Sequence, residues 1–172
     1  MAITAFAPDD TMTSGNTVVN FMPAVKDIEK PTLEEWNAGF MVQCAIEGYN
    51  ASTDAKTQER KKLCDRVATQ SVGSRTYNLD NMTIVSDDPQ ADAPLPPILI
   101  NDATIFVGVR PGLDHTAPAA NGQKVWIDKA TIVAVDPAEI NTDDGNAFGW
   151  VIQFAVKARS YKATIATAAP KG

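Results

Sequence analysis

The chain has 172 residues, of which 44% are hydrophobic, and its 11 prolines and 10 glycines favour a single, mainly β domain with a real core. Its formal net charge of −6 argues against long-range attraction to nucleic-acid phosphates over the whole surface. No segment approaches the ~18 apolar residues of a membrane helix, and the N-terminus lacks a basic region before an apolar run, so we expect synthesis in the cytosol with neither a membrane anchor nor an export signal.

The N-terminal residues 1–16 are polar and lack periodicity, which favours an extended arm that becomes ordered only against a partner. Residues 17–22 have the pattern of a short strand. We expect residues 17–165 to form one domain with a long exposed segment at 50–72, followed by a C-terminal tail at 166–172.

Residues 31–49 predict a short helical turn followed by a strand. Thr32 and Glu35 have the spacing of a capping box, and Gly39 suits the left-handed conformation that often ends a helix. From Phe40 onward the apolar residues recur with period two, as in a half-buried strand. The expected core face carries Phe40, Val42, Cys44 and Ile46, and the opposite face carries Gln43 and Glu47.

The segment at 50–72 is ambiguous between helix and extended structure. Its helix propensity is high, but its apolar residues make only a thin stripe, so we expect a long exposed hairpin or loop. A run of charge like this one is most commonly a solvated surface. The segment holds five of the 15 basic residues: Lys56, Arg60, Lys61, Lys62 and Arg66.

The apolar residues of the stretch 75–88 change phase in its middle. Tyr77 and Leu79 share one phase, whereas Met82 and Ile84 share the other. This pattern predicts either a bulge or tight turn near Asp80, or two short strands that meet at a corner. The prolines at 94, 96 and 97 then restrict any helix in residues 89–101 to a single turn.

The C-terminal half contains the strongest strand signals. Residues 103–110 form a compact apolar run of the kind buried on both faces, and residues 124–136 and 148–164 predict two long strands that pair antiparallel. In the last strand, apolar residues from Phe148 to Val156 alternate with polar ones, and we assign Gln153, Lys157 and Arg159 to the polar face. The connection between the two long strands carries Asp143 and Asp144 in an acidic turn.

The sequence offers no chemistry that we assign to an enzyme. The single histidine, His115, falls in an expected loop, where it makes a poor member of a catalytic triad, and no glycine-rich phosphate loop is followed by a helix. The acidic sets Asp87, Asp88 and Asp92, and Asp143 and Asp144, do not follow the order of a calcium-binding EF-hand. Cys44 and Cys64 lack metal-ligand spacing and are expected to remain thiols. We therefore predict no enzyme, no metal and no cofactor.

Three pieces of sequence, in order, resemble the major tail tube proteins of phages with long non-contractile tails (siphoviruses), especially those that infect actinobacteria. The pieces are PTLEEWNAG with a following stretch that ends in EGY, then SRTYNLDNMTIVSDDP, and finally KVWIDKATIVAVDP with FGWVIQFAVKARSYKATIA. The resemblance implies a two-sheet β-sandwich or barrel with one short helix. It further implies hexameric rings that stack into a hollow tube through which DNA leaves the capsid.

The same resemblance implies a set of partners and a location. The partners are other copies of the chain, together with tape-measure, tail terminator and distal tail proteins, and DNA passes through the lumen without specific binding. Assembly takes place in the host cytoplasm, and the product is part of the virion. In this family a helix commonly follows the second sequence piece, but here the prolines at 94, 96 and 97 interrupt that place.

The segregation of charge suggests how rings stack. We expect the basic segment 56–66 to reach from one ring toward acidic turns of the next, with Asp87, Asp88, Asp143 and Asp144 as acceptors. Polar strand residues, namely Gln43, Glu47 and Gln153, are candidates for the lumen wall. Two alternatives stay open: a tail terminator or head-tail joining protein that acts as a single ring, and a calcium- or carbohydrate-binding β-sandwich module in which tryptophans stack on sugars.

Overall fold

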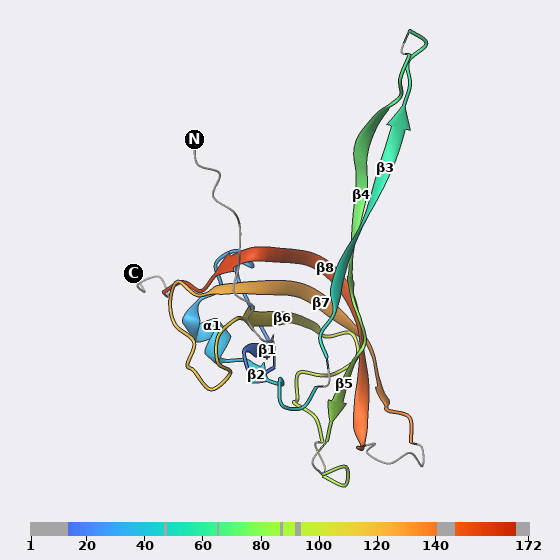
Figure 1. Cartoon of the computed structure of the whole chain (residues 1–172). Helices are drawn as coiled ribbons and strands as arrows, with labels where there is room; N and C mark the ends of the chain where they lie inside the picture. Colours follow the sequence, from blue (N-terminus) through green and yellow to red (C-terminus); the bar gives the residue numbers. More distant parts are fainter. Residues whose placement is uncertain are drawn as a thin grey trace.

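The computed structural model describes residues 14–46, 48–64, 66–86, 88–91, 94–140 and 147–167. Six antiparallel strands form one curled sheet in the order β2-β1-β6-β7-β8-β5, and β3 and β4 form a separate two-stranded sheet (Figure 1). This arrangement confirms the mainly β, two-sheet fold with one short helix. The elements are β1 (Thr17–Met22), α1 (Leu33–Asn37), β2 (Phe40–Met41), β3 (Ala51–Arg60), β4 (Thr69–Leu79), β5 (Met82–Val85), β6 (Thr104–Pro111), β7 (Lys124–Pro137) and β8 (Gly149–Thr164).

Both faces of the curled sheet carry buried residues, which requires apolar residues on both faces of its central strands. On the inner face, β1, β6, β7 and β8 contribute a core that β5 and the segments near 42–49 and 95–103 close. On the outer face, α1 and its flanking segments cover a second core. The prediction that residues 103–110 form a strand buried on both faces is confirmed, because β6 alternates between these two cores.

Helix α1 begins as predicted. The backbone N–H of Glu35 donates to Thr32 Oγ1 at 3.1 Å, and the backbone N–H of Thr32 donates to Glu35 Oε2 at 2.8 Å, which completes a capping box. The helix places Trp36, which is fully buried, over β6 at Gly108. A Cβ atom at Gly108 would lie 2.7 Å from the Trp36 ring, so only glycine leaves room for this packing.

The helix ends differently from the prediction. Ala38, in a right-handed conformation, is its C-cap, and Gly39 does not adopt a left-handed conformation. Glycine is needed at this position for a different reason: a Cβ atom there would collide with the side chain of Asn20, whose Nδ2 donates to the Trp36 carbonyl at 2.7 Å.

The prediction of a strand from Phe40 to Tyr49 is wrong beyond its first residues. Strand β2 covers only Phe40–Met41, the chain turns at residues 43–45, and Ile46 forms an isolated bridge with Ile84. Val42 and Ile46 both reach the inner core from this turn, so their spacing imitates a strand. Cys44 is exposed and is not the buried hydrophobe expected, while Gln43 lies in the turn.

The phase change near Asp80 is a corner between two sheets. Strand β4 belongs to the β3–β4 hairpin, and β5, which follows after two intervening residues, pairs with β8 in the curled sheet. Residues 51–60 and 69–79 are strands, so the ambiguous segment takes the extended conformation of a hairpin and not that of a helix.

The two long C-terminal strands pair antiparallel as predicted, from Lys124 opposite Thr164 to Pro137 opposite Trp150. The register shifts at three places along this pair. Within the described residues no helix has the length and apolar character needed to cross a membrane. Most of the expected N-terminal arm and C-terminal tail lies outside the described residues.

Candidate assembly surface

The β3–β4 hairpin is the most exposed element of the described chain. It projects from the body as two strands alone (Figure 1). Every residue from Ser52 to Arg60 is exposed, and the apolar side chains of Leu63, Val67 and Val72 are exposed as well. At about 3.3 Å per residue, a strand of this length spans roughly 30 Å. Because a lone two-stranded hairpin is at best marginally stable in water, this one needs support beyond its own strand pairing.

Arg159 of β8 supplies the support at the base. Its Nε lies 2.6 Å from Asp128 Oδ1, and its Nη2 donates to Asp128 Oδ2 at 2.9 Å. The same guanidinium donates to the carbonyls of both hairpin strands, at 2.5 Å to Ser52 in β3 and 2.9 Å to Asn78 in β4. One side chain thus ties the hairpin to β7 and β8.

The surroundings favour the charged form of Arg159. Burial by itself would lower the pKa of Arg159, but the hydrogen bonds and negative charge of Asp128 raise it on balance. Tyr49 donates to Asp128 Oδ2 at 3.2 Å. Burial, and next the charge of Asp128, raise the pKa of Tyr49, so the phenol stays protonated as a donor. The rings of Tyr77 and Tyr161 lie over the guanidinium, with centroids 5.5 and 5.3 Å from its carbon. We call Tyr49, Asp128 and Arg159 the hairpin anchor.

The assignment of Arg159 to the polar face of the last strand is wrong, and a bulge explains the error. Ala130 pairs with Val156, but Lys129 pairs with Ala158, so Lys157 is an extra residue in β8. An extra residue reverses the alternation of side chains beyond it. Arg159 therefore lies opposite Asp128, on the same face as Val156. The signal that could have found this pair is Asp128 itself, which lies among apolar residues within a buried strand, because a buried carboxylate needs a cationic partner.

The predicted inter-ring residues divide into a described group and a group outside the described residues. All five basic candidates are exposed on the outer half of the hairpin: Lys56 and Arg60 lie in β3, and Lys61, Lys62 and Arg66 lie in the turn region. Asp88 is exposed outside the hairpin. Asp87, Asp143 and Asp144 lie outside the described residues, and so does the lumen candidate Glu47.

The two described lumen candidates differ in their settings. Gln153 is half-buried on β8, opposite Ala134, and faces away from Ile152 and Phe154. Gln43 is half-buried in a turn, and its Oε1 is buried without a hydrogen-bond partner.

The comparisons with known proteins agree with this architecture. A family model with the description "Phage tail tube protein" matches residues 4–169, which is nearly the whole chain. A comparison with curated proteins found no match. The mainly β fold and the sequence resemblance point the same way. The chain therefore belongs to the phage tail tube protein family and is a structural protein of the phage tail.

Proposed function

We propose that this chain forms hexameric rings that stack into the hollow tail tube of a long-tailed, non-contractile phage, and that DNA leaves the capsid through this tube. The observation that carries the proposal is the hairpin: it is anchored by buried charge at its base and exposed on both sides beyond that base. A segment with this geometry reaches well past the body that holds it. Contact with a neighbouring copy stabilises the hairpin, which is only marginally stable when it is surrounded by water.

Open strand edges support closure into a ring. Strand β5 covers β8 only from Gly149 to Ile152, and no strand of the described chain pairs with that edge of β8 further along. At the other edge of the sheet, β2 is only two residues long. Unpaired edges bind other strands, and a ring of copies removes them by continuing the sheet from one subunit to the next.

Charge supports stacking of the rings. The outer half of the hairpin is basic, whereas the chain as a whole carries a net charge of −6, so the remaining surface is strongly acidic. A contact between two different surfaces of the same protein does not close on itself. It can therefore repeat from ring to ring along one axis. We propose that segment 56–66 meets acidic turns of the next ring, with Asp88 and the undescribed Asp87, Asp143 and Asp144 as acceptors.

The acidic balance also suits a passage for DNA. A wall without excess positive charge does not attract the phosphates of DNA, so DNA slides past without specific binding. Gln43, Glu47 and Gln153 remain our candidates for this wall.

We propose tape-measure, tail terminator and distal tail proteins as partners, and assembly in the host cytoplasm. The N-terminal arm at 1–16 and the tail at 166–172, outside the single domain at 17–165, are further candidates for contacts between rings.

Negative-stain microscopy of the purified chain tests the proposal. We expect tubes built of stacked six-fold rings. Reversing Arg60, Lys61 and Lys62 to glutamate should prevent tube growth while the circular dichroism spectrum and melting temperature of the subunit stay unchanged. The matched control reverses Lys26, Lys30 and Lys162, which are exposed outside the hairpin and change the net charge by the same amount.

Each outcome has a consequence. Normal tubes from the hairpin variant, or equal loss of tubes from the control, would remove the role given to the basic segment. Rings that never elongate under any condition would instead indicate a protein that acts as a single ring, such as a tail terminator.

A further inference from the structure

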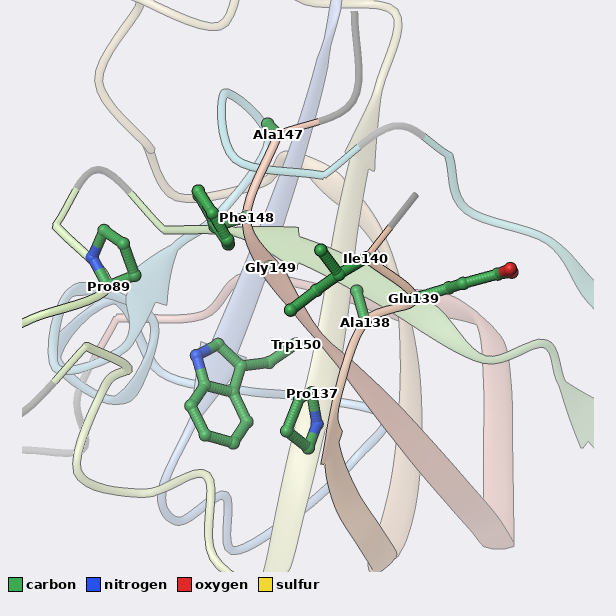
Figure 2. A pocket seen from close by; sticks show the side chains of 9 residues that line it. All are labelled: Pro89, Pro137, Ala138, Glu139, Ile140, Ala147, Phe148, Gly149 and Trp150. Atoms are coloured by element: carbon green, nitrogen blue, oxygen red, sulfur yellow. The ribbon is translucent and has the colours of Figure 1, made fainter. Parts of the chain in front are cut away.

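An apolar pocket of about 170 Å³ opens where β7 ends and β8 begins (Figure 2). Pro137 and Ile140 come from the end of β7 and the residues after it, and Phe148 and Trp150 come from the start of β8 and the residue before it. Pro89 lies on the side of Phe148 away from Ile140 (Figure 2). Ile140 and Phe148 keep 77% and 58% of their surface exposed. Exposed aromatic and aliphatic side chains around a hollow are typical of a surface that another chain covers.

The end of β7 and the start of β8, which contribute to the pocket, lie at the end of the molecule opposite the hairpin turn (Figure 1). The turn carries Leu63, whose side chain is fully exposed, between the basic residues Lys62 and Arg66. A cavity of about 150 Å³ is enough to hold a benzene ring, so a pocket of this size accepts one leucine side chain.

We propose that Leu63 of one copy inserts into this pocket on the copy in the next ring. The inference rests on the proposed stacking function and names the surface that receives the hairpin. A chain cannot place its own Leu63 in its own pocket, because the hairpin anchor directs the hairpin away from the end of the molecule where β7 ends and β8 begins (Figure 1). The occupant is therefore a second copy.

Charge at the two surfaces is complementary. Exposed Glu139 belongs to the pocket lining, and its side chain extends away from the apolar residues (Figure 2). Exposed Asp88 directly precedes Pro89 of the lining in the chain. A leucine entering the pocket would bring Lys61, Lys62 and Arg66 of the turn toward these carboxylates. The apolar contact supplies most of the affinity, whereas the charges steer the approach and fix the orientation.

A disulfide cross-link tests the contact directly. Native Cys64 follows Leu63 in the turn, and exposed Ala147 precedes Phe148 at the pocket. Tubes of the Ala147→Cys variant, with Cys44→Ser to remove the other thiol, are oxidised and run on a non-reducing gel. We expect a ladder of covalent multimers. The matched control is Ala120→Cys in the same background, because Ala120 is exposed at the other end of β7, and it should give monomer only.

A second measurement uses the concentration above which tubes form. Leu63→Asp should raise this concentration about tenfold or more, because a buried leucine contact is lost, while Leu63→Met should leave it within about twofold.

The pocket contact and the proposed function can fail separately. Tubes from the unmodified chain, combined with no ladder from Ala147→Cys or an equal ladder from Ala120→Cys, would overturn the pocket contact and leave the proposed function in place. The absence of rings and tubes from the unmodified chain would overturn the proposed function and the contact together.

Discussion

Arg159 of β8 and Asp128 of β7 form a buried ion pair, with 2.6 Å between Nε and Oδ1 and both side chains only 2% exposed. Removing two charges from water costs about as much as their attraction returns, so such a pair adds little net stability compared with apolar residues. Its geometry has a clearer consequence. The same guanidinium bonds one carbonyl in each strand of the hairpin, which fixes where the hairpin leaves the body.

Asp128→Asn should therefore destabilise the subunit. The variant keeps the shape of the side chain but leaves Arg159 buried without a counter-charge, and breaking a buried pair in this way costs about 3–5 kcal/mol. Urea denaturation followed by circular dichroism measures the loss. Asp136→Asn, at an exposed position of the same strand, is the matched control and should change stability by less than about 0.5 kcal/mol. Equal effects of the two substitutions would contradict a special role for the buried pair.

Stability should also fall at high pH because of Tyr49. Its pKa in the folded protein is raised above the ordinary value, so above about pH 10 the unfolded chain loses this proton while the folded chain keeps it. The contribution of Tyr49 to the free energy of unfolding is complete below pH 10 and decreases by about 1.4 kcal/mol per pH unit above pH 10. Urea denaturation of the wild type and Tyr49→Phe at pH 9 and pH 11 measures the difference.

We expect Tyr49→Phe to lose less stability than the wild type between these two pH values. Tyr161→Phe, which removes an exposed phenol near the same guanidinium, is the control and should lose as much stability as the wild type between pH 9 and pH 11. An equal loss of stability in Tyr49→Phe and the wild type would show that the Tyr49 phenol has its ordinary pKa.

Gly108→Ala should destabilise the outer core. The added methyl group would lie 2.7 Å from a Trp36 ring carbon and 2.8 Å from Met22 Cε, and overpacking of a buried site costs about 1–3 kcal/mol. Gly48→Ala is the control, because a Cβ atom there meets nothing within 4 Å. Differential scanning calorimetry should show a lower melting temperature for the first variant alone. An unchanged melting temperature would mean that Trp36 moves aside without loss of packing.

Most of the sheet was predictable because its strands are long and their burial follows a simple period. The runs at 17–22, 103–110, 124–136 and 148–164 end within a residue or two of β1, β6, β7 and β8. Burial on one or both faces leaves a clear pattern of apolar residues in each of them. The capping box was also readable, because it depends only on residues three apart.

The errors arise where local order depends on distant residues. Val42 and Ile46 have strand spacing, yet they reach the core from a turn. The bulge at Lys157 comes from the pairing of β8 with β7, and the sequence pattern of β8 alone does not indicate it. The hairpin anchor was missed as a consequence of this bulge, because Arg159 was assigned to the wrong face. The apolar pocket joins residues from three separate segments and has no sequence pattern of its own.

Removing the outer hairpin should separate folding from assembly. Ala55 of β3 pairs with Arg75 of β4, so an Asn-Gly turn in place of residues 56–74 would close the strands with a two-residue hairpin loop. The hairpin anchor and both cores lie outside the deleted part, so unfolding free energy should change by less than about 1 kcal/mol. Sedimentation velocity should detect no particle larger than a single ring, whereas the full chain forms tubes. Tubes from the shortened chain would mean that rings stack through the body alone, and a failure to fold would mean that the exposed strands stabilise the subunit itself.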